Sequence, residues 1–377
     1  MQPPSRNHGL SPIQDAHRIV VKVGSSSLTG ADGHLDEDAL RVLVDALAEK
    51  AKTAQLVLVT SGAVAAGLRP LGFESRPSDI ASVQAAASVG QVHLVAAYDK
   101  AFKRHGLTIG QVLLTADDTV RRRRYDNAQR ALTTLLENGA VPIINENDAV
   151  TTAELKFGDN DRLAALVALL VRADALVLLT DVAGLYDKAP SEPDAHRIPF
   201  VEDMHDLAGV SVTSKGSSVG TGGMVTKLDA ARIATASGIP VLLAAASEAE
   251  KALAGADIGT LFAPVGRRAS GRMHWLAHAA KVRGKLILDD GAAHAIRGGS
   301  ASLLAVGVLG IEGDFDAGDP VALIDGKGHQ VARGLVAFGS LELARLLGRN
   351  SKWLGKAFGP QYERPIVHRD DLVITPA

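Results

Sequence analysis

The chain has 377 residues, of which 46% are hydrophobic and 22% charged, a composition typical of a soluble globular protein large enough for more than one domain. Its formal net charge is −2 and it has no cysteine, which excludes a global attraction to nucleic acid, disulfides, thiolate metal sites and a cysteine nucleophile. Residues 1–17 read as a frayed polar tail, and the longest apolar run, residues 163–171, is far below the roughly 20 residues that span a bilayer, so we expect a cytoplasmic protein with no membrane association.

The first predicted unit is a β-strand over residues 18–23, a Gly/Ser loop and a helix over residues 36–51. Lys22 interrupts this otherwise apolar strand. A lysine on a buried strand is costly unless its ammonium group meets a partner. The strand end is therefore either open to solvent or the place where an anion binds.

A second strand over residues 55–60 ends in the small residues 61–67, which would let a ligand approach the backbone closely. A helix over residues 78–104, a strand over 107–114 and a helix over 126–137 are predicted next. The arginine run 121–124 is more typical of a solvated helix face than of a nucleic-acid site, and we assign it no role.

A short apolar strand, residues 141–144, leads into the most polar stretch of the chain. Asn145, Glu146, Asn147 and Asp148 follow it directly, and residues 158–161 (Gly-Asp-Asn-Asp) precede the helical run 162–171. Active sites of open α/β sheets lie at this end of their strands. A polar loop in which Asp159 or Asn160 caps the next helix is the alternative interpretation.

A strand over residues 174–180 ends at Thr180 and Asp181, and a glycine-rich segment, residues 214–227, runs into a helix over 226–236. Glycine-exposed amides at a helix start can bind phosphate, and Lys227 adds a charge, although such loops are common in other roles. Neither common nucleotide-binding fingerprint is present. With a last strand over 239–244, residues 18–264 predict an α/β domain with a doubly wound, mostly parallel sheet sandwiched by helices.

The composition changes after residue 264. Residues 265–280 predict a linker, and residues 281–377 predict a small, mostly β domain with a C-terminal tail. Its expected strands cover residues 285–288, 304–311, 320–324 and 331–336, separated by turns.

In their order and spacing these motifs closely resemble the glutamate 5-kinases of the amino acid kinase superfamily. The resemblance covers about residues 18–262, and the second domain is similar to the PUA domain that many bacterial members carry. It rests on four groups of residues: Lys22 before Gly24-Ser25-Ser26; Thr60-Ser61-Gly62-Ala63; residues 145–148 with 158–161; and Thr180-Asp181 with residues 220–224 and Lys227.

The resemblance implies ATP-dependent phosphorylation of the side-chain carboxylate of L-glutamate to L-glutamyl 5-phosphate, the first step of proline biosynthesis, with ATP and Mg²⁺ as cofactors. This chemistry is compatible with the residues present. A carboxylate acceptor is already ionised at pH 7 and needs no general base, so the reaction mainly requires positioning and charge neutralisation.

By the same resemblance, Lys22 contacts the ATP phosphates, Lys227 stabilises charge on the transferring phosphoryl group, and Asp161 orients both lysines. Ser61, Asp148 and Asn160 match the glutamate-binding positions, with Asp148 paired to the α-ammonium group. The implied nucleotide site comprises Lys22, Thr180, Asp181, Thr221, Gly222, Gly223, Met224, Val225, Thr226 and Lys227. Asp159 and Asp161 are candidates for magnesium contacts, direct or through water.

Two alternatives stay open at this point. One is another superfamily member that phosphorylates N-acetylglutamate, aspartate or carbamate. The other is an RNA-binding PUA protein with a kinase-like scaffold; from Arg267 onward the chain has 15 Lys and Arg against 11 Asp and Glu, an excess too mild to favour RNA. The resemblance further implies a homo-oligomer (dimer or tetramer), inhibition by proline and handover of the product to glutamyl phosphate reductase.

Overall fold

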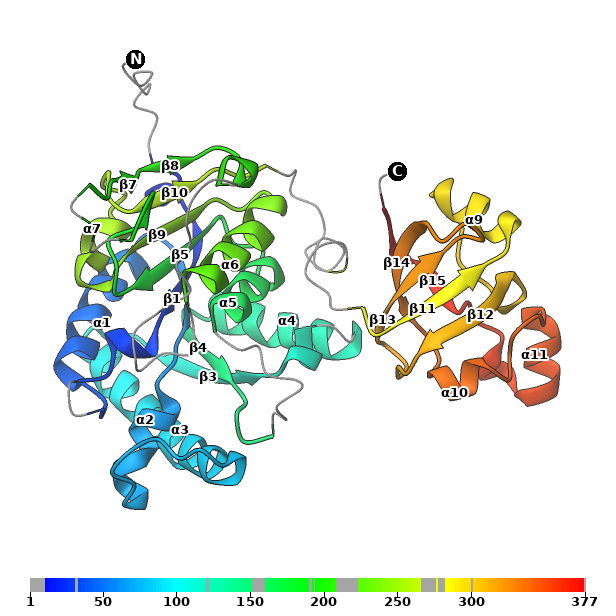
Figure 1. Cartoon of the computed structure of the whole chain (residues 1–377). Helices are drawn as coiled ribbons and strands as arrows, with labels where there is room; N and C mark the ends of the chain where they lie inside the picture. The colour runs from blue at the N-terminus through cyan, green and yellow to red at the C-terminus, as the bar shows by residue number, and fades with distance from the viewer. Residues whose placement is uncertain are drawn as a thin grey trace, which may run out of the picture. The chain divides into compact units, whose positions relative to one another are not determined.

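The computed structural model describes residues 11–30, 33–119, 122–150, 160–189, 192, 194–207, 223–265, 276, 282–299 and 301–375. They form two compact units. The first contains the strands β1 to β10, and the second contains the strands β11 to β15 (Figure 1).

The first unit is built on an eight-stranded sheet. Its strands are, in spatial order, β3 (Ile109–Leu114), β4 (Val141–Glu146), β2 (Gln55–Val59), β1 (Arg18–Val23), β5 (Ala175–Thr180), β9 (Val241–Ala245), β10 (Thr260–Phe262) and β8 (Phe200–Val201). The first six strands in this order, β3, β4, β2, β1, β5 and β9, are all parallel, and β10 runs antiparallel to β9. The predicted doubly wound, mostly parallel sheet is confirmed.

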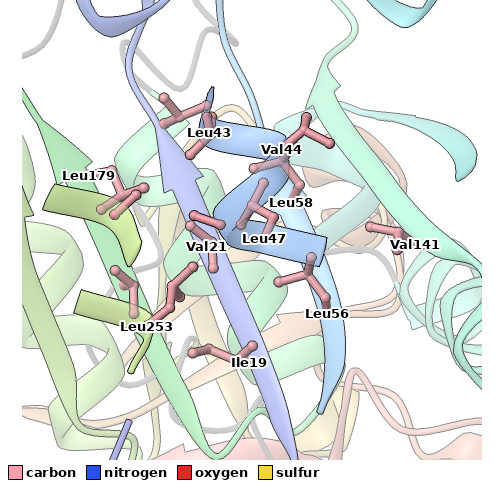
Figure 2. Packing of buried hydrophobic residues seen from close by; sticks show 14 of the residues in the cluster. Ile19, Val21, Leu43, Val44, Leu47, Leu56, Leu58, Val141, Leu179 and Leu253 are labelled. Carbon is pink, nitrogen blue, oxygen red and sulfur yellow. The ribbon is translucent and has the colours of Figure 1, made fainter. Parts of the chain in front are cut away.

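One face of this sheet carries a continuous apolar core. Alternate residues of β1, namely Ile19, Val21 and Val23, pack there with residues of α1 (Glu37–Ala51), α3 (Ile80–Lys103) and α7 (Ala249–Leu253). Figure 2 shows the side chains of α1 interleaved with those of β1 and β2. Because side chains alternate across a strand, Lys22 lies on the opposite face of β1.

The opposite face is covered by α5 (Asn160–Leu170), which packs against β1 and β5 and is itself in contact with α6 (Met224–Ala236). Every residue of α5 except Arg162 is buried. A helix enclosed between a sheet and a second helix needs apolar residues on all sides, which explains the apolar run in this segment. The remaining large helix, α4 (Arg122–Glu137), is bonded to the end of α5 through Gln129 and the carbonyl of Leu170.

The segment after β2 differs from its prediction. Residues 61–67 were expected to precede the helix predicted over residues 78–104. Instead, an additional helix, α2 (Ala63–Leu68), begins directly after Gly62 and packs closely on α3. The small residues serve this helix crossing, since an added Cβ atom at Gly67 would lie 1.8 Å from the carbonyl oxygen of Ala86, and one at Gly90 would lie 1.7 Å from that of Ala63.

Replacement of Gly90 by alanine is expected to lower the free energy of unfolding by about 3 kcal/mol or more, because the new methyl group meets backbone atoms that cannot rotate away. Denaturant unfolding measures the effect. Ser88→Ala, on the exposed side of the same helix, is the matched control and should change stability by less than about 0.5 kcal/mol. Equal stability of the two variants would contradict the close crossing.

The second unit contains a five-stranded sheet in the order β12 (Val308–Gly313), β11 (Gly284–Leu288), β13 (Pro320–Ile324), β14 (Gln330–Val336) and β15 (Val367–Ile374). Its described helices are α9 (Asp290–Arg297), α10 (Ser340–Leu343) and α11 (Ser351–Phe358). The four predicted strands are present, although β12 starts later than expected because residues 305–307 form a 3-10 turn. β15 was not predicted, because the consecutive polar residues 368–371 interrupt the alternation of apolar and polar residues that marks a strand.

The predicted N-terminal tail needs a correction for residues 11–17. Ile13 is fully buried in the core of the first unit, and the Nζ atom of Lys50 donates to the carbonyl oxygens of Ile13 at 2.8 Å and Gln14 at 2.9 Å. This segment is packed because it supplies acceptors to a buried ammonium group. Residues 1–10 lie outside the described residues. So does the predicted linker, residues 265–280, except for Val265 and Leu276.

Candidate functional site

Four neighbouring strands of the first unit end at the same edge of the sheet. β4, β2, β1 and β5 are adjacent and parallel, so their last residues lie side by side. The helices α5 and α6 begin with polar residues of the predicted site. Open α/β sheets bind their ligands outside this edge, a place called the crevice here.

A buried ion triad forms the centre of this crevice. The Oδ1 atom of Asp161 lies 2.6 Å from the Nζ atom of Lys22, and its Oδ2 atom lies 3.1 Å from that of Lys227. Asp161 is fully buried, while Lys22 and Lys227 are 2% and 8% exposed. The sequence left two alternatives for Lys22, a strand end open to solvent or a place where an anion binds. The burial of Lys22 excludes the first of them.

The position of each charge follows from its element. Lys22 projects from β1 toward the face that α5 covers, and Asp161 stands in the first turn of α5. Lys227 stands in the first turn of α6, beside Thr226, whose hydroxyl donates to the Oδ2 atom of Asp161 at 3.0 Å. One carboxylate therefore collects donors from a strand and a neighbouring helix.

The three charged groups together carry a charge of +1. Charges removed from water are stable only when they are paired and hydrogen-bonded. The formal charge of these three groups suits an anion such as a phosphate. α6 adds to this, because its N-cap residue Gly223 supplies no side-chain cap and its amide end favours negative charge.

A second polar cluster lies around the first residue of α5. The Nδ2 atom of Asn160 is 2.7 Å from the carbonyl oxygen of Thr60, 3.0 Å from the Oγ atom of Ser61 and 2.8 Å from the Oδ1 atom of Asn145. These contacts join the ends of β2, β4 and α5. The Oδ1 atom of Asn160 is buried and accepts no hydrogen bond from any described residue, which makes it available to a donor on a ligand.

The end of β5 supplies the residues predicted for the nucleotide. Thr180 is buried and its hydroxyl donates to the Oδ1 atom of Asp181, which is itself exposed, at 2.9 Å. The Oγ1 atom of Thr226 also lies 2.8 Å from the carbonyl oxygen of Gly223, so its single hydrogen is shared between that carbonyl and Asp161 at the start of α6. A buried hydroxyl beside an exposed carboxylate provides polar groups at the rim of the same crevice.

The predicted site residues divide into three groups. Direct contacts join Lys22, Asp161 and Lys227, and separately Ser61 and Asn160. Asp148 follows β4 in a turn and is half-buried; Thr180, Asp181, Gly223, Met224, Val225 and Thr226 lie at the ends of β5 or the start of α6. Asp159, Thr221 and Gly222 lie outside the described residues.

Asn145 belongs to the site, although it was not among the predicted site residues. Its Oδ1 atom accepts from the Nδ2 atom of Asn160 and from the backbone amide of Glu146, so it supports Asn160 from the neighbouring strand. Its place in the polar stretch after an apolar strand was the available signal. Thr60 was also missed as a support, because its contact with Asn160 spans 100 positions of the chain.

The described residues contain no group of three or more His, Cys, Asp or Glu side chains able to hold a metal ion. Both carboxylate oxygens of Asp161 already face protein donors. Mg²⁺ takes few protein ligands and keeps several waters when it binds together with phosphates. The residues present therefore fit a magnesium ion held mainly by a nucleotide.

Comparison with protein families gives two matches along the chain. The family described as "Amino acid kinase family" matches residues 17–245, and the PUA domain matches residues 284–354. The first match covers more than half of the sequence and includes all the predicted site residues.

Curated relatives are similar over nearly their whole length. A protein of Streptomyces coelicolor named glutamate 5-kinase is 58% identical over 364 residues, covering 96% of this chain and 97% of the relative. One of Bifidobacterium animalis subsp. lactis with the same name is 54% identical over 376 residues, covering 99% and 100%. Among solved structures, the carbamate kinase of Giardia lamblia bound to AMP-PNP has 17% identity and a TM-score of 0.50, covering 66% of this chain and 99% of that one, which shows a shared fold.

Proposed function

Because this chain belongs to the amino acid kinase family and continues into a PUA domain, we propose that it transfers the γ-phosphoryl group of ATP to the side-chain carboxylate of L-glutamate. The product would be L-glutamyl 5-phosphate, the first intermediate of proline biosynthesis. The similarity to glutamate 5-kinases at 54–58% identity supports the substrate. The observation that carries the reaction type is the buried triad of Lys22, Asp161 and Lys227 at the ends of the parallel strands.

The geometry supports phosphoryl transfer without a general base. The ionised side-chain carboxylate of glutamate attacks the γ-phosphorus atom, and ADP leaves. Lys22 neutralises charge on the ATP phosphates, and Lys227 neutralises the charge that develops on the transferring group. Asp161 holds both ammonium groups in place, so little reorganisation is needed during the reaction.

Magnesium fits this scheme as the ion that enters with ATP and neutralises part of its phosphate charge. We propose that the phosphates hold it, together with water, and that Asp159 and Asp161 are reached through that water. At the nucleotide end, Thr180, Asp181 and residues 221–227 form the proposed binding segment.

The proposed glutamate site comprises Ser61, Asp148 and Asn160. The Oδ1 atom of Asn160, which accepts no hydrogen bond from a described residue, and the hydroxyl of Ser61 offer polar contacts at the end of β2. Asp148, in the turn after β4, would pair with the α-ammonium group. This pairing distinguishes glutamate from N-acetylglutamate and carbamate, which have no free α-ammonium group.

Asp148→Ala is expected to raise KM for glutamate by at least about tenfold, since one charged hydrogen bond is lost, while KM for ATP stays within about twofold of wild type. Steady-state kinetics at saturating ATP measures it. Glutarate, which lacks the α-amino group, is the matched comparison substrate. The variant should treat glutarate as the wild type does, and an unchanged KM for glutamate would contradict the assignment.

The reaction itself is tested by ADP release over a panel of acids that includes glutamate, N-acetylglutamate, aspartate and carbamate. Hydroxylamine in the assay traps an acyl phosphate as the hydroxamate. Glutamate-dependent ADP release with hydroxamate formation is the expected result. Turnover of another acid in preference to glutamate would overturn the proposed substrate.

We also propose that the chain forms a homo-oligomer, either a dimer or a tetramer. α3 supports this, because its exposed side carries an uncharged stripe over nearly four turns, formed by Ala81, Ala85, Ser88, Val92 and Ala96. α3 is also the one helix among the described residues that is long and apolar enough to cross a membrane, a test that core helices pass as well. Light scattering that gave only the monomer mass of 39.2 kDa would contradict the oligomer.

An acyl phosphate hydrolyses readily in water, so we propose that the product is handed to glutamyl phosphate reductase. The proposal places the protein in the cytoplasm, where ATP and glutamate are present. RNA binding by the PUA domain is not part of the proposal.

A further inference from the structure

Tyr98 is a buried polar residue that the proposed mechanism does not use. It lies on α3, is fully buried, and its hydroxyl group lies 2.8 Å from the Oγ1 atom of Thr60. Thr60 follows β2 directly and precedes Ser61, which belongs to the proposed glutamate site. A helix on the core face of the sheet thus contacts the substrate loop, defined here as residues 60–62.

The direction of this hydrogen bond follows from the second contact of Thr60. Its Oγ1 atom also lies 3.1 Å from the carbonyl oxygen of Ser61, which can only accept. A threonine hydroxyl has one hydrogen, so when it donates to Ser61 it must accept from Tyr98. Burial raises the pKa of Tyr98, which keeps the phenol protonated and able to donate at physiological pH.

The hydrogen bonds from Tyr98 to Thr60 and from Thr60 to Ser61 determine the orientation of the peptide between Ser61 and Gly62. In a trans peptide the carbonyl and the amide point in opposite directions, so a carbonyl held toward Thr60 turns the Gly62 amide the other way. Gly62 has a φ of 97°, in the left-handed region that glycine tolerates. Without the restraint from Thr60, rotation of this peptide would be cheap.

The rest of Thr60 is held from two other directions. Its backbone amide donates to the carbonyl oxygen of Ile144 at 2.9 Å, and its carbonyl accepts from Asn160 at 2.7 Å. The substrate loop is therefore anchored by β4, α5 and α3, and Tyr98 is the anchor from α3. The close crossing of α2 and α3 at Gly67 and Gly90 keeps that helix at a fixed distance from the loop.

We propose that Tyr98 is a positioning residue for glutamate, which acts through Thr60 to hold the Ser61–Gly62 peptide in its binding orientation. Tyr98 itself touches neither substrate. The inference rests on the proposed function and adds a residue to it from outside the crevice. Its role is in the affinity for the amino acid and not in the transfer step.

Tyr98→Phe removes the donor and keeps the buried ring. The expected result is a rise of about three- to tenfold in KM for glutamate, the scale of one net hydrogen bond, with kcat and KM for ATP within about twofold of wild type. Phe102→Leu is the matched control on the same helix, since Phe102 is fully buried with its ring centroid 6.4 Å from that of Tyr98. It should lower the melting temperature without changing KM for glutamate.

A double-mutant cycle with Thr60→Val tests the route of the effect. If Tyr98 acts through Thr60, the double variant should have the KM of Thr60→Val alone. An unchanged KM in Tyr98→Phe, additive effects in the cycle, or an equal rise in Phe102→Leu would each overturn the inference. Wild-type turnover of glutamate in the same assay separates this outcome from failure of the proposed function.

Discussion

Lys227→Ala is expected to lower kcat by about a hundredfold or more while KM for glutamate stays nearly unchanged. Lys227 stands in the first turn of α6, and its ammonium group lies 3.1 Å from the Oδ2 atom of Asp161. A charge that acts on the transferring phosphoryl group stabilises the transition state more than the bound substrates, so its loss appears in kcat. Steady-state kinetics with both substrates varied measures the split.

Lys50→Ala is the matched control for this experiment. Lys50 is another buried lysine of the same unit, but its ammonium group binds carbonyl oxygens of Ile13 and Gln14 in the N-terminal segment. Its replacement should lower the melting temperature and leave kcat within about twofold of wild type. A normal kcat in Lys227→Ala, or an equal loss in both variants, would contradict a specific role of Lys227 in transfer.

Asp161→Asn is expected to cost both stability and activity. Asparagine retains the shape but removes the carboxylate that both ammonium groups contact, and it places an amide donor against one of them. Breaking a buried ion pair from one side costs about 3–5 kcal/mol, so thermal unfolding should occur at a clearly lower temperature. We expect kcat to fall by at least about a hundredfold, because both lysines lose their orientation.

Asp174→Asn provides the comparison at the opposite end of β5. The Oδ2 atom of Asp174 accepts from the backbone amides of His17 and Arg18, far in the sheet from the ends where the site lies. The variant should lose some stability and retain kcat. If Asp161→Asn unfolded at the wild-type temperature, the triad would not be the buried charge network that its geometry indicates.

The hydrophobic pattern was sufficient for the architecture. The runs that became β1, β2 and β5 are apolar on both faces, as strands covered by helices on both sides must be. The glycines and polar residues between these runs marked where strands end and helices begin. The edge of the sheet that carries the candidate site was therefore predictable as well. Short elements were harder to predict; the helix expected over residues 78–104 is α3, whereas α2 was not predicted.

Long-range contacts were not predictable in the same way. Lys22 in an apolar strand signalled a partner without identifying it, and Asp161, which lies 139 positions away in the numbering, was identified only through the resemblance. Asn145, Thr60 and Tyr98 have no individual signature, because the local sequence shows neither that these side chains are buried nor which partners they contact. Their roles depend on which side chains the sheet order brings together.

The sequence by itself determined the fold class, the change from an α/β part to a mostly β part, and the set of polar residues at the strand ends. These follow from local periodicity and chain order, which act over a few residues at a time. The tertiary structure placed one buried carboxylate against both lysines, as the resemblance implied, and it alone showed that α3 reaches the substrate loop through Tyr98. Such contacts depend on the order β4, β2, β1, β5 and on the packing of helices against it, since these alone bring residues distant in the chain within hydrogen-bonding distance.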